Sequence, residues 1–466
     1  MRRRLSCTIS LKSPVLPPES GSGAGSKDAG TCDIQAFLRQ SDFREPMNAK
    51  HIALVGTGGS SGDTLALVEA AIRAQEPAST FVFIDTQPFN LRTRGYTRYN
   101  GTGQVQVLSP ENCGVHAYTG SQTTNLMLNG GPLAYRKLLT RCAQAIGPKA
   151  DVLVLCHDRM YVETALVRAA KARGIPTVLL QEGPFCAIGS TRAQSSMLRA
   201  KAALAPLINM SRLVPAIPDY GMAGHDLVIA VSETYRDRWI NAGLDPRAVK
   251  VAGVPRFDRL YSSPPGGETR PPRPKAAQTL RLLYITQPFA AHGKVSHEAA
   301  RTALDVMIAG LNLARRNISF DLTIRAHPRS TGDDVAHLRT GLEFAATMDD
   351  GTASIDVEIG RADAVIGHYS TGLLESLMLG CPAICVPVPE HGFAERAEAE
   401  KQIWLTATGV PVARTADELT TAIGLVARGE ALTEINWPRL GEETGPTDGS
   451  ACEVAARAIL IAADFS

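Results

Sequence analysis

The sequence predicts an α/β protein with two parallel sheets, each covered by helices. Three observations support this fold class. Short apolar runs alternate with helix-length amphipathic segments from His51 onward. The alternation stops at Ser262–Lys275, a stretch rich in Pro, Gly and Arg, and then restarts. The length of 466 residues exceeds one ordinary core and suits two or three domains.

The first block follows residues 1–48, which we predict to be a disordered extension because Pro, Gly and Ser dominate much of them. Residues 49–261 are predicted to form the first domain. Its expected strands are short apolar runs at Ile52–Val55, Phe81–Ile84, Val152–Leu155, Thr177–Leu180, Leu227–Val231 and Val249–Pro255. Its expected helices are Asp63–Arg73, Leu133–Ile146, Val162–Arg173 and Ser232–Gly243. Residues 86–130 give no clear order of elements.

The second block follows a predicted linker, residues 262–279. Residues 280–445 are predicted to form the second domain, and residues 446–466 a C-terminal helix over Ala451–Ala463. The expected strands of this domain are Arg281–Ile285, Phe320–Ile324, Ser354–Val357, Ala364–Ile366 and Ala383–Val386. One expected helix runs over His297–Arg315, and another starts at Ser370. Two such blocks predict two sheets that face each other across a cleft.

The composition and the missing motifs argue against several classes of function. The net charge of +2 gives no general attraction to nucleic acid. The nine cysteines have no regular spacing, so we expect reduced core thiols of a cytoplasmic protein. The chain has no D-x-D, no H-E-x-x-H and no Cys/His cluster, so no catalytic metal and no cofactor are expected. It also lacks the G-x-S-x-G and G-x-x-x-x-G-K-[ST] motifs of serine hydrolases and nucleotide hydrolases.

Contact with a membrane surface is an open alternative. No run of about eighteen apolar residues is present, so no spanning helix is expected. The basic start at Arg2–Arg4 would suit either an anionic membrane or a solvated tail. Ser196–Leu213 carries basic residues among Ala, Leu and Met, as an interfacial helix, a flap over an acceptor or a core helix would. The sequence gives no indication of the oligomeric state.

Polar groups follow five of the expected strands. Ligands of open parallel sheets bind beyond the carboxyl ends of the strands, so these groups are the first candidates for a site. The five strand ends are Gly56–Asp63, His157–Arg159, Gln181–Gly183, Arg325–Arg329 and His368–Gly372. The first of them contains Gly58, Gly59, Ser60 and Ser61, where the backbone could approach a ligand closely.

A phosphate site is predicted where Ser370, Thr371 and Gly372 open a helix directly after an apolar strand. The helix N-terminus and two hydroxyls would converge on one point, where the helix dipole favours an anion. One turn later, Glu375 could reach a ribose hydroxyl. The alternative is an ordinary capped helix.

Acid–base groups are predicted at other strand ends. His327 follows Phe320–Ile324 and could bond a nucleotide phosphate, with Arg325 adding positive potential. Glu182 follows a buried strand and is a candidate general base, with Asp158 as its competitor. The alternatives are a loop histidine beside solvated arginines, and a structural Glu182 paired with Arg159.

These residues together resemble glycosyltransferases of the GT-B fold, which have two Rossmann-like domains. Three motifs look like those of bacterial sialyltransferases and polysialyltransferases, which use cytidine-nucleotide donors: Gln181-Glu182-Gly183, His327-Pro328 and Ser370-Thr371. CDP-glycerol glycerophosphotransferases share the last two, as do UDP-N-acetylglucosamine 2-epimerases more distantly. The chain departs from the first motif at Gln181, where an acidic residue would stand.

The resemblance implies a metal-independent transfer from a nucleotide-sugar donor, with a CMP-sugar favoured, to a saccharide or glycolipid acceptor in surface polysaccharide biosynthesis. Glu182 would be the base, and His327 would assist the leaving phosphate. The acceptor would lie near Gly58–Ser61. Two alternatives stay open: an isomerase of the 2-epimerase kind, although its Gly-Thr-Arg-Pro-Glu opening is absent, and a non-catalytic nucleotide-sugar-binding protein.

Overall fold

The computed structural model describes most of the chain after the predicted N-terminal extension. The described residues are 49–90, 98–119, 122–184, 217–260, 279–290, 294–327, 330, 332–351, 353–393, 405–446 and 448–465. The predicted extension, most of the predicted linker and Ser196–Leu213 lie outside them.

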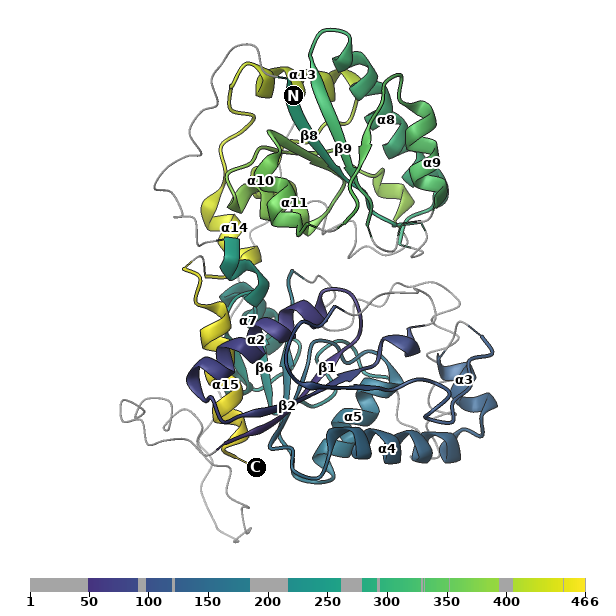
Figure 1. The fold of residues 1–466 in the computed structure, drawn as a ribbon, viewed down its shortest axis with the longest axis vertical. Coiled ribbons are helices and arrows are strands. Elements are labelled where there is room, and N and C mark those ends of the chain that lie inside the picture. Colours follow the sequence, from purple (N-terminus) through teal and green to yellow (C-terminus); the bar gives the residue numbers. More distant parts are fainter. Residues whose placement is uncertain are drawn as a thin grey trace, which may run out of the picture. The chain divides into compact units, whose positions relative to one another are not determined.

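The first sheet contains seven parallel strands in the order β3-β2-β1-β4-β5-β6-β7 (Figure 1). The strands are β1 His51–Gly56, β2 Thr80–Asp85, β3 Gln104–Val107, β4 Val152–Leu155, β5 Thr177–Leu180, β6 Leu227–Ala230 and β7 Val249–Val251. All six expected strands are confirmed, and β3 is an addition from the region that the sequence left without order. The apolar runs fill this sheet because its central strands are buried on both faces.

Helices cover both faces of the first sheet. They are α2 Ser61–Gln75, α3 Gln122–Leu128, α4 Pro132–Ile146, α5 Tyr161–Lys171 and α7 Glu233–Asn241, with short 3₁₀ helices η1 Gln87–Phe89, η2 Pro246–Ala248 and η3 Pro255–Leu260. The C-terminal helix α15, Ala451–Ala463, packs beside α2 in one apolar core. Helices α4 and α5 pack against each other and contribute to the core on the other face.

The second sheet contains five parallel strands in the order β10-β9-β8-β11-β12. The strands are β8 Leu280–Ile285, β9 Phe320–Arg325, β10 Thr347–Met348, β11 Ala364–Gly367 and β12 Ala383–Cys385. The helices of this part are α8 His297–Arg315, α9 Gly332–Gly341, α10 Ile355–Arg361, α11 Thr371–Met378, α13 Ala416–Ala427 and α14 Trp437–Thr444, with the 3₁₀ helix η4 Glu390–Gly392. Helices α8 and α13 pack together against one core of this sheet. The prediction of two parallel-sheet α/β domains is thus confirmed.

One predicted strand is wrong. Residues 354–357 begin helix α10, and the short strand lies earlier, at Thr347–Met348. Ile355, Val357 and Ile359 alternate as in a strand, which misled the prediction. In the structure Ile359 is buried and Val357 is 42% exposed. Ile355 and Ile359 are four residues apart and therefore lie on one face of a helix. The apolar contacts of these two residues thus favour a helix over a strand.

Strand order reverses direction once in each sheet. The chain builds outward from β1 to β3 and then returns to add β4 on the other side of β1. In the second sheet the same reversal lies between β8 and β11. Such switch points leave a crevice at the carboxyl ends of the strands. The segments after β1, β4, β8 and β11 are therefore the expected places for a ligand-binding site.

The described cysteines are free thiols, and five of the six are buried. This agrees with the expected core role. Among the described helices, none combines the length and apolar character needed to cross a bilayer.

Candidate functional site

The loop after β5 is held by the buried side chain of Gln181. Its Oε1 accepts hydrogen bonds from the Val231 amide and the Trp239 indole, both at 3.3 Å. Its Nε2 donates to the Gly183 carbonyl at 3.0 Å. A carboxylate at this position could not make the last bond, because it has no N–H. The amide at Gln181 therefore fixes the turn that presents Glu182.

Glu182 meets the glycine-rich loop that follows β1. The Ser60 hydroxyl lies 3.4 Å from Glu182 Oε1. The loop itself is braced by Ser61, whose hydroxyl accepts from the Thr57 amide and donates to the Gly58 carbonyl, both at 3.1 Å. The structure thus brings together two strand ends that the sequence marked separately.

Glycines are required at the turn of this loop. Gly58 and Gly59 have φ angles of 91° and 71°, in the left-handed region. Side chains there would be strained, so these positions favour glycine. The result is a tight turn between β1 and α2 that brings Ser60 beside Glu182.

The carboxylate of Asp158 has a structural role. It is fully buried, and its carboxylate accepts from the Gly221 and Ala223 amides at 3.0 and 3.2 Å, with His225 Nε2 at 3.2 Å. Both oxygens are thereby occupied in anchoring the segment around residues 221–225. Burial also lowers the pKa of the neighbouring His157 to about 4, so that imidazole is neutral at pH 7.

The segment after β11 forms a capped helix start. Ser370 Oγ accepts from the Gly372 amide at 3.2 Å and from Gln287 Nε2 at 2.7 Å. Gln287 follows β8, so this second bond crosses the switch point of the second sheet. A Cβ atom at Gly372 would lie 2.9 Å from Ile285 Cδ1, which explains why the smallest residue stands there. Ser370 and Thr371 also line a cavity with Pro184, Tyr369, Leu374, Leu405 and Glu443.

His368, in the same strand end, is a core residue. Its Nδ1 lies 2.9 Å from the Val386 carbonyl, which can only accept, so Nδ1 carries the proton. Nε2 then accepts from the Tyr284 hydroxyl at 2.9 Å. Burial lowers the pKa of His368 and keeps the ring neutral. Both ring nitrogens are committed, and nothing is left for a phosphate.

His327 is positioned by Thr286, a residue that sequence reasoning missed. The His327 amide donates to Thr286 Oγ1 at 2.8 Å, and the His327 carbonyl accepts from the Ser330 amide at 2.8 Å. Thr286 also lies 2.9 Å from Ser330 Oγ. Because β8 separates β9 from β11, Thr286 and Gln287 connect the His327 loop on one side to Ser370 on the other.

Arg325 is engaged with a carboxylate. Its guanidinium lies 2.5 Å from Asp349, and the two side chains are 13% and 5% exposed. A phosphate would have to compete with this buried ion pair for Arg325. Arg329 and Pro328, named with it in the sequence prediction, lie outside the described residues.

Glu375 pairs with Arg256, the most important residue that the sequence prediction missed. Arg256 Nη1 lies 2.8 Å from Glu375 Oε1. Arg256 Nε and Glu375 Oε2 are buried and have no hydrogen-bond partner among the described residues. A Cβ atom at Gly183 would lie 3.7 Å from Arg256 Nη2, so the same guanidinium also borders the Glu182 loop. Arg256 lies in η3, beyond the end of β7, so a search confined to the strand ends did not reach it.

Glu443 of α14 adds a second buried carboxyl to the cavity beside Thr371. It accepts from the Tyr235 hydroxyl at 3.0 Å and lies 2.7 Å from the Arg439 guanidinium. Burial raises its pKa to about 7, so both of its protonation states are populated near neutral pH. No sequence motif marked this residue.

No group of three or more His, Cys, Asp or Glu among the described residues could hold a metal ion.

Comparisons with known proteins give a match in structure and none in sequence. No protein-family model matches the chain, and no curated protein matches it. S. aureus MnaA in complex with UDP matches with a TM-score of 0.52 at 14% identity, over 87% of this chain and 94% of that one. A UDP-GlcNAc 2-epimerase from Methanocaldococcus jannaschii matches with a TM-score of 0.52 at 12% identity, over 88% of this chain and 99% of that one. At these identities the likeness concerns the fold alone, and the chain therefore has the two Rossmann-like domains of the GT-B fold.

Proposed function

We propose that this chain is a glycosyltransferase of the GT-B type that needs no catalytic metal. It would transfer a sugar from a nucleotide-sugar donor to a saccharide or glycolipid acceptor in surface polysaccharide biosynthesis. The motif resemblance at Glu182-Gly183, His327-Pro328 and Ser370-Thr371 is the ground for favouring a CMP-sugar.

The observation that carries the proposal is the hydrogen-bonded bridge at the switch point of the second sheet. Thr286 bonds the His327 amide at 2.8 Å, and the adjacent Gln287 bonds Ser370 Oγ at 2.7 Å. Such a bridge would hold a proton donor and a helix N-terminus on either side of one phosphate. An ordinary capped helix does not need the second half of this arrangement.

The proposed reaction is a single displacement. The acceptor hydroxyl attacks the anomeric carbon, and Glu182 takes its proton. The bond between that carbon and the phosphate oxygen breaks, and the electron pair stays on the leaving nucleotide. His327 donates a hydrogen bond or a proton to that phosphate, while Ser370, Thr371 and Gly372 bind it. Glu182 is preferred over Asp158 as the base, because Asp158 is fully buried and its oxygens are already occupied.

Arg256 and Glu375 complete the proposed donor site. Glu375 would accept hydrogen bonds from the ribose hydroxyls through Oε2, the buried oxygen that has no partner among the described residues. Arg256 holds the other oxygen at 2.8 Å and so sets the orientation of the carboxylate. The loop Gly58–Ser61 would face the acceptor through Gly59 and Ser60, since Ser60 lies beside the proposed base. Ser61 is buried and braces the loop.

A second candidate is an isomerase that acts on a UDP-sugar. Of the two structural neighbours named above, one is a complex with UDP and the other is a UDP-GlcNAc 2-epimerase, and this supports the candidate. Such an enzyme needs no acceptor and releases no free nucleotide at equilibrium.

Calorimetric titration with CMP, CDP, UMP, UDP and GDP, without metal and then with magnesium, tests the proposal. We expect metal-independent binding of a cytidine nucleotide, followed by acceptor-dependent release of free nucleotide from the matching donor. A preference for UDP with interconversion of the nucleotide-sugar would support the isomerase. Binding without turnover on any donor and acceptor would indicate a non-catalytic binding protein, and no binding at all would refute the site.

A further inference from the structure

Helices α3 and α4 form a surface with an unusual charge pattern. From residue 112 to residue 150 the sequence contains no Asp or Glu, yet it contains Arg136, Lys137, Arg141 and Lys149. Those 39 residues therefore carry a formal charge of +4, whereas the whole chain carries +2. Such a concentration of one sign creates a local field that attracts anionic partners.

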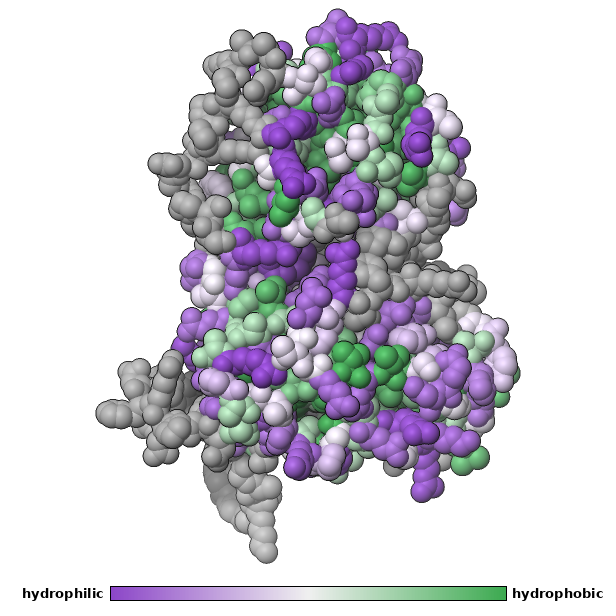
Figure 2. All heavy atoms as spheres, viewed as in Figure 1, coloured by the Kyte–Doolittle hydropathy of each residue, from purple (hydrophilic) through white to green (hydrophobic). Residues whose placement is uncertain are grey.

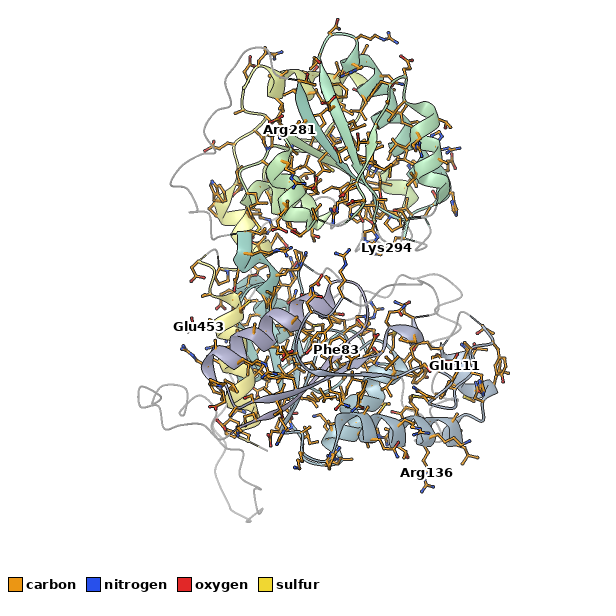
Figure 3. The ribbon with its side chains drawn as sticks, in the orientation of Figure 1. Phe83, Glu111, Arg136, Arg281, Lys294 and Glu453 are labelled. Atoms are coloured by element: carbon orange, nitrogen blue, oxygen red, sulfur yellow. The ribbon has the colours of Figure 1, made fainter. Side chains whose placement is uncertain are left out.

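The basic residues lie on the outer side of α4. Arg136, Lys137 and Arg141 are exposed, while Tyr135, Leu138 and Cys142 are buried. Figure 3 shows Arg136 projecting from α4 away from the sheet. None of the three makes an ion pair with a described residue, although Arg141 bonds Gln144 at 3.1 Å. Their charges thus remain available at the surface.

Large apolar side chains are exposed at the start of the same surface. Met127, Leu128 and Leu133 are 45%, 60% and 69% exposed. Six of the nine large hydrophobic residues exposed in the described part of the chain lie between residues 105 and 133. In the space-filling view, hydrophilic residues dominate the region of α3 and α4, with smaller hydrophobic areas among them (Figure 2). Exposed apolar side chains that gather in one region of a surface mark a site of contact with a partner or a membrane.

The apolar end is on the functional edge of the first sheet. Helix α4 leads into β4, so its first residues lie toward the carboxyl ends of the parallel strands. The Tyr161 amide, after β4, donates to Gln122 Oε1 of α3 at 3.1 Å, which ties α3 to that edge. Leu128 and Leu133 are therefore on the side of the sheet where the Glu182 loop lies.

We propose that the α3–α4 surface docks on an anionic lipid bilayer, with Leu128 and Leu133 entering the interface and Arg136, Lys137 and Arg141 contacting lipid phosphates. Basic residues beside exposed apolar side chains match the two layers of a bilayer surface. A nucleic acid would use the charges but leave the apolar side chains without a role. A second copy meeting this face symmetrically would bring like charges together. This inference does not depend on the proposed reaction.

Vesicle co-sedimentation of the full chain tests the inference. We expect binding to equimolar phosphatidylcholine and phosphatidylglycerol, weaker at high salt, and little binding to phosphatidylcholine alone. R136Q/K137Q/R141Q should weaken this binding about tenfold or more, because each basic residue at an anionic surface contributes separately. L128S/L133S should weaken it too, with less effect on its salt dependence.

The matched control is R301Q/R316Q/R339Q, which removes three exposed arginines from the second domain. It should bind the vesicles like the wild type. Circular dichroism and nucleotide titration should show that all three variants keep their fold and their donor site, which separates a failure of this inference from a failure of the proposed reaction. Absence of wild-type binding, equal loss in the control, or full binding by both α3–α4 variants would overturn the inference. So would a change in oligomeric state caused by L128S/L133S while vesicle binding is unaffected.

Discussion

Arg256 Nη1 lies 2.8 Å from Glu375 Oε1, and the two side chains are only 16% and 3% exposed. The pair joins η3, which follows the first sheet, to α11, which follows β11 of the second. A buried ion pair of this kind is costly to break from one side, because the remaining charge has no solvent to stabilise it.

Replacing Arg256 should therefore destabilise the protein. We expect Arg256→Ala to lower the free energy of unfolding by about 3 kcal/mol and to abolish nucleotide binding, since Glu375 would be left unpaired. Urea denaturation and calorimetry measure the two effects. Arg259→Ala is the matched control from the same 3₁₀ helix. Arg259 pairs with Asp356 at 3.2 Å but is 40% exposed, so its loss should cost less than about 1 kcal/mol. Equal costs for the two variants would show that burial of the Arg256 pair has no special importance.

His327→Ala should lower turnover by a factor on the order of 10² to 10⁴, because a proton or hydrogen-bond donor to the leaving group is lost. The melting temperature should hardly change, since it is the backbone of His327 that bonds Thr286. His337→Ala is the control, because His337 pairs with Asp305 on α8, away from the strand ends. Turnover equal to that of the wild type would remove His327 from the mechanism.

Gln181→Glu tests whether the amide or an acid is required before Glu182. We expect a loss of stability of about 2 kcal/mol, because a carboxylate would face the Gly183 carbonyl in a site that is 1% exposed. Turnover should fall as the Glu182 turn loses its brace. Gln181→Met removes the same bonds without adding charge and should show a similar fall in turnover. A gain in activity from Gln181→Glu would mean that the position is meant to carry an acid.

Ser370→Ala separates helix capping from phosphate binding. The loss of the cap should cost about 1 kcal/mol, and nucleotide affinity should fall as well. Ser296→Ala removes an equivalent cap from α8, where Ser296 accepts from the Ala299 amide at 3.2 Å. This control should lose similar stability and keep its nucleotide affinity. If both variants bind nucleotide equally well, Ser370 is only a cap.

Glu163 makes stability depend on pH. Burial raises its pKa to about 8 from the ordinary glutamate value of 4.5. The folded state therefore holds a proton that the unfolded state has released, and stability falls as pH rises from about 4.5 to about 8. Glu163→Gln should remove this contribution, which is on the order of a few kcal/mol at pH 8, and should change little at pH 4. Glu298→Gln, at an exposed position, is the control for thermal unfolding at both pH values. A stabilisation equal at pH 4 and pH 8 would contradict this account.

The repeated strand and helix signals were enough to predict the fold class. Runs such as Val152–Leu155 and Thr177–Leu180 are buried at every position, so their sequences are short and largely apolar, as expected for buried parallel strands. The prediction failed where the spacing of apolar residues fits both a strand and a helix, as at Ile355 and Ile359. It was silent over β3, because Val105 and Val107 lie on an exposed edge strand and alternate with Gln.

The candidate site was predictable only in outline. The strand-end rule found Glu182, His327 and Ser370, since each lies within three residues of the end of a strand. It did not mark their supports. Thr286 and Gln287 follow β8 and Arg256 lies in η3, but each acts through a contact with a residue far away in the chain, which the sequence does not show. For the same reason it could not tell that Asp158 and Arg325 are already engaged, by backbone amides in one case and by Asp349 in the other.

The C-terminal helix has a consequence for biosynthesis. Asp258 of η3 accepts from the Ala451 and Cys452 amides at 3.0 and 2.6 Å, and α15 covers the apolar face beside Leu65, Val68 and Ile72. During synthesis, the first sheet emerges from the ribosome long before the helix that covers it. Until residue 463 has been translated, that face stays uncovered and prone to aggregation. A nascent chain of this protein should therefore need chaperone protection for the whole time in which the second domain is being made.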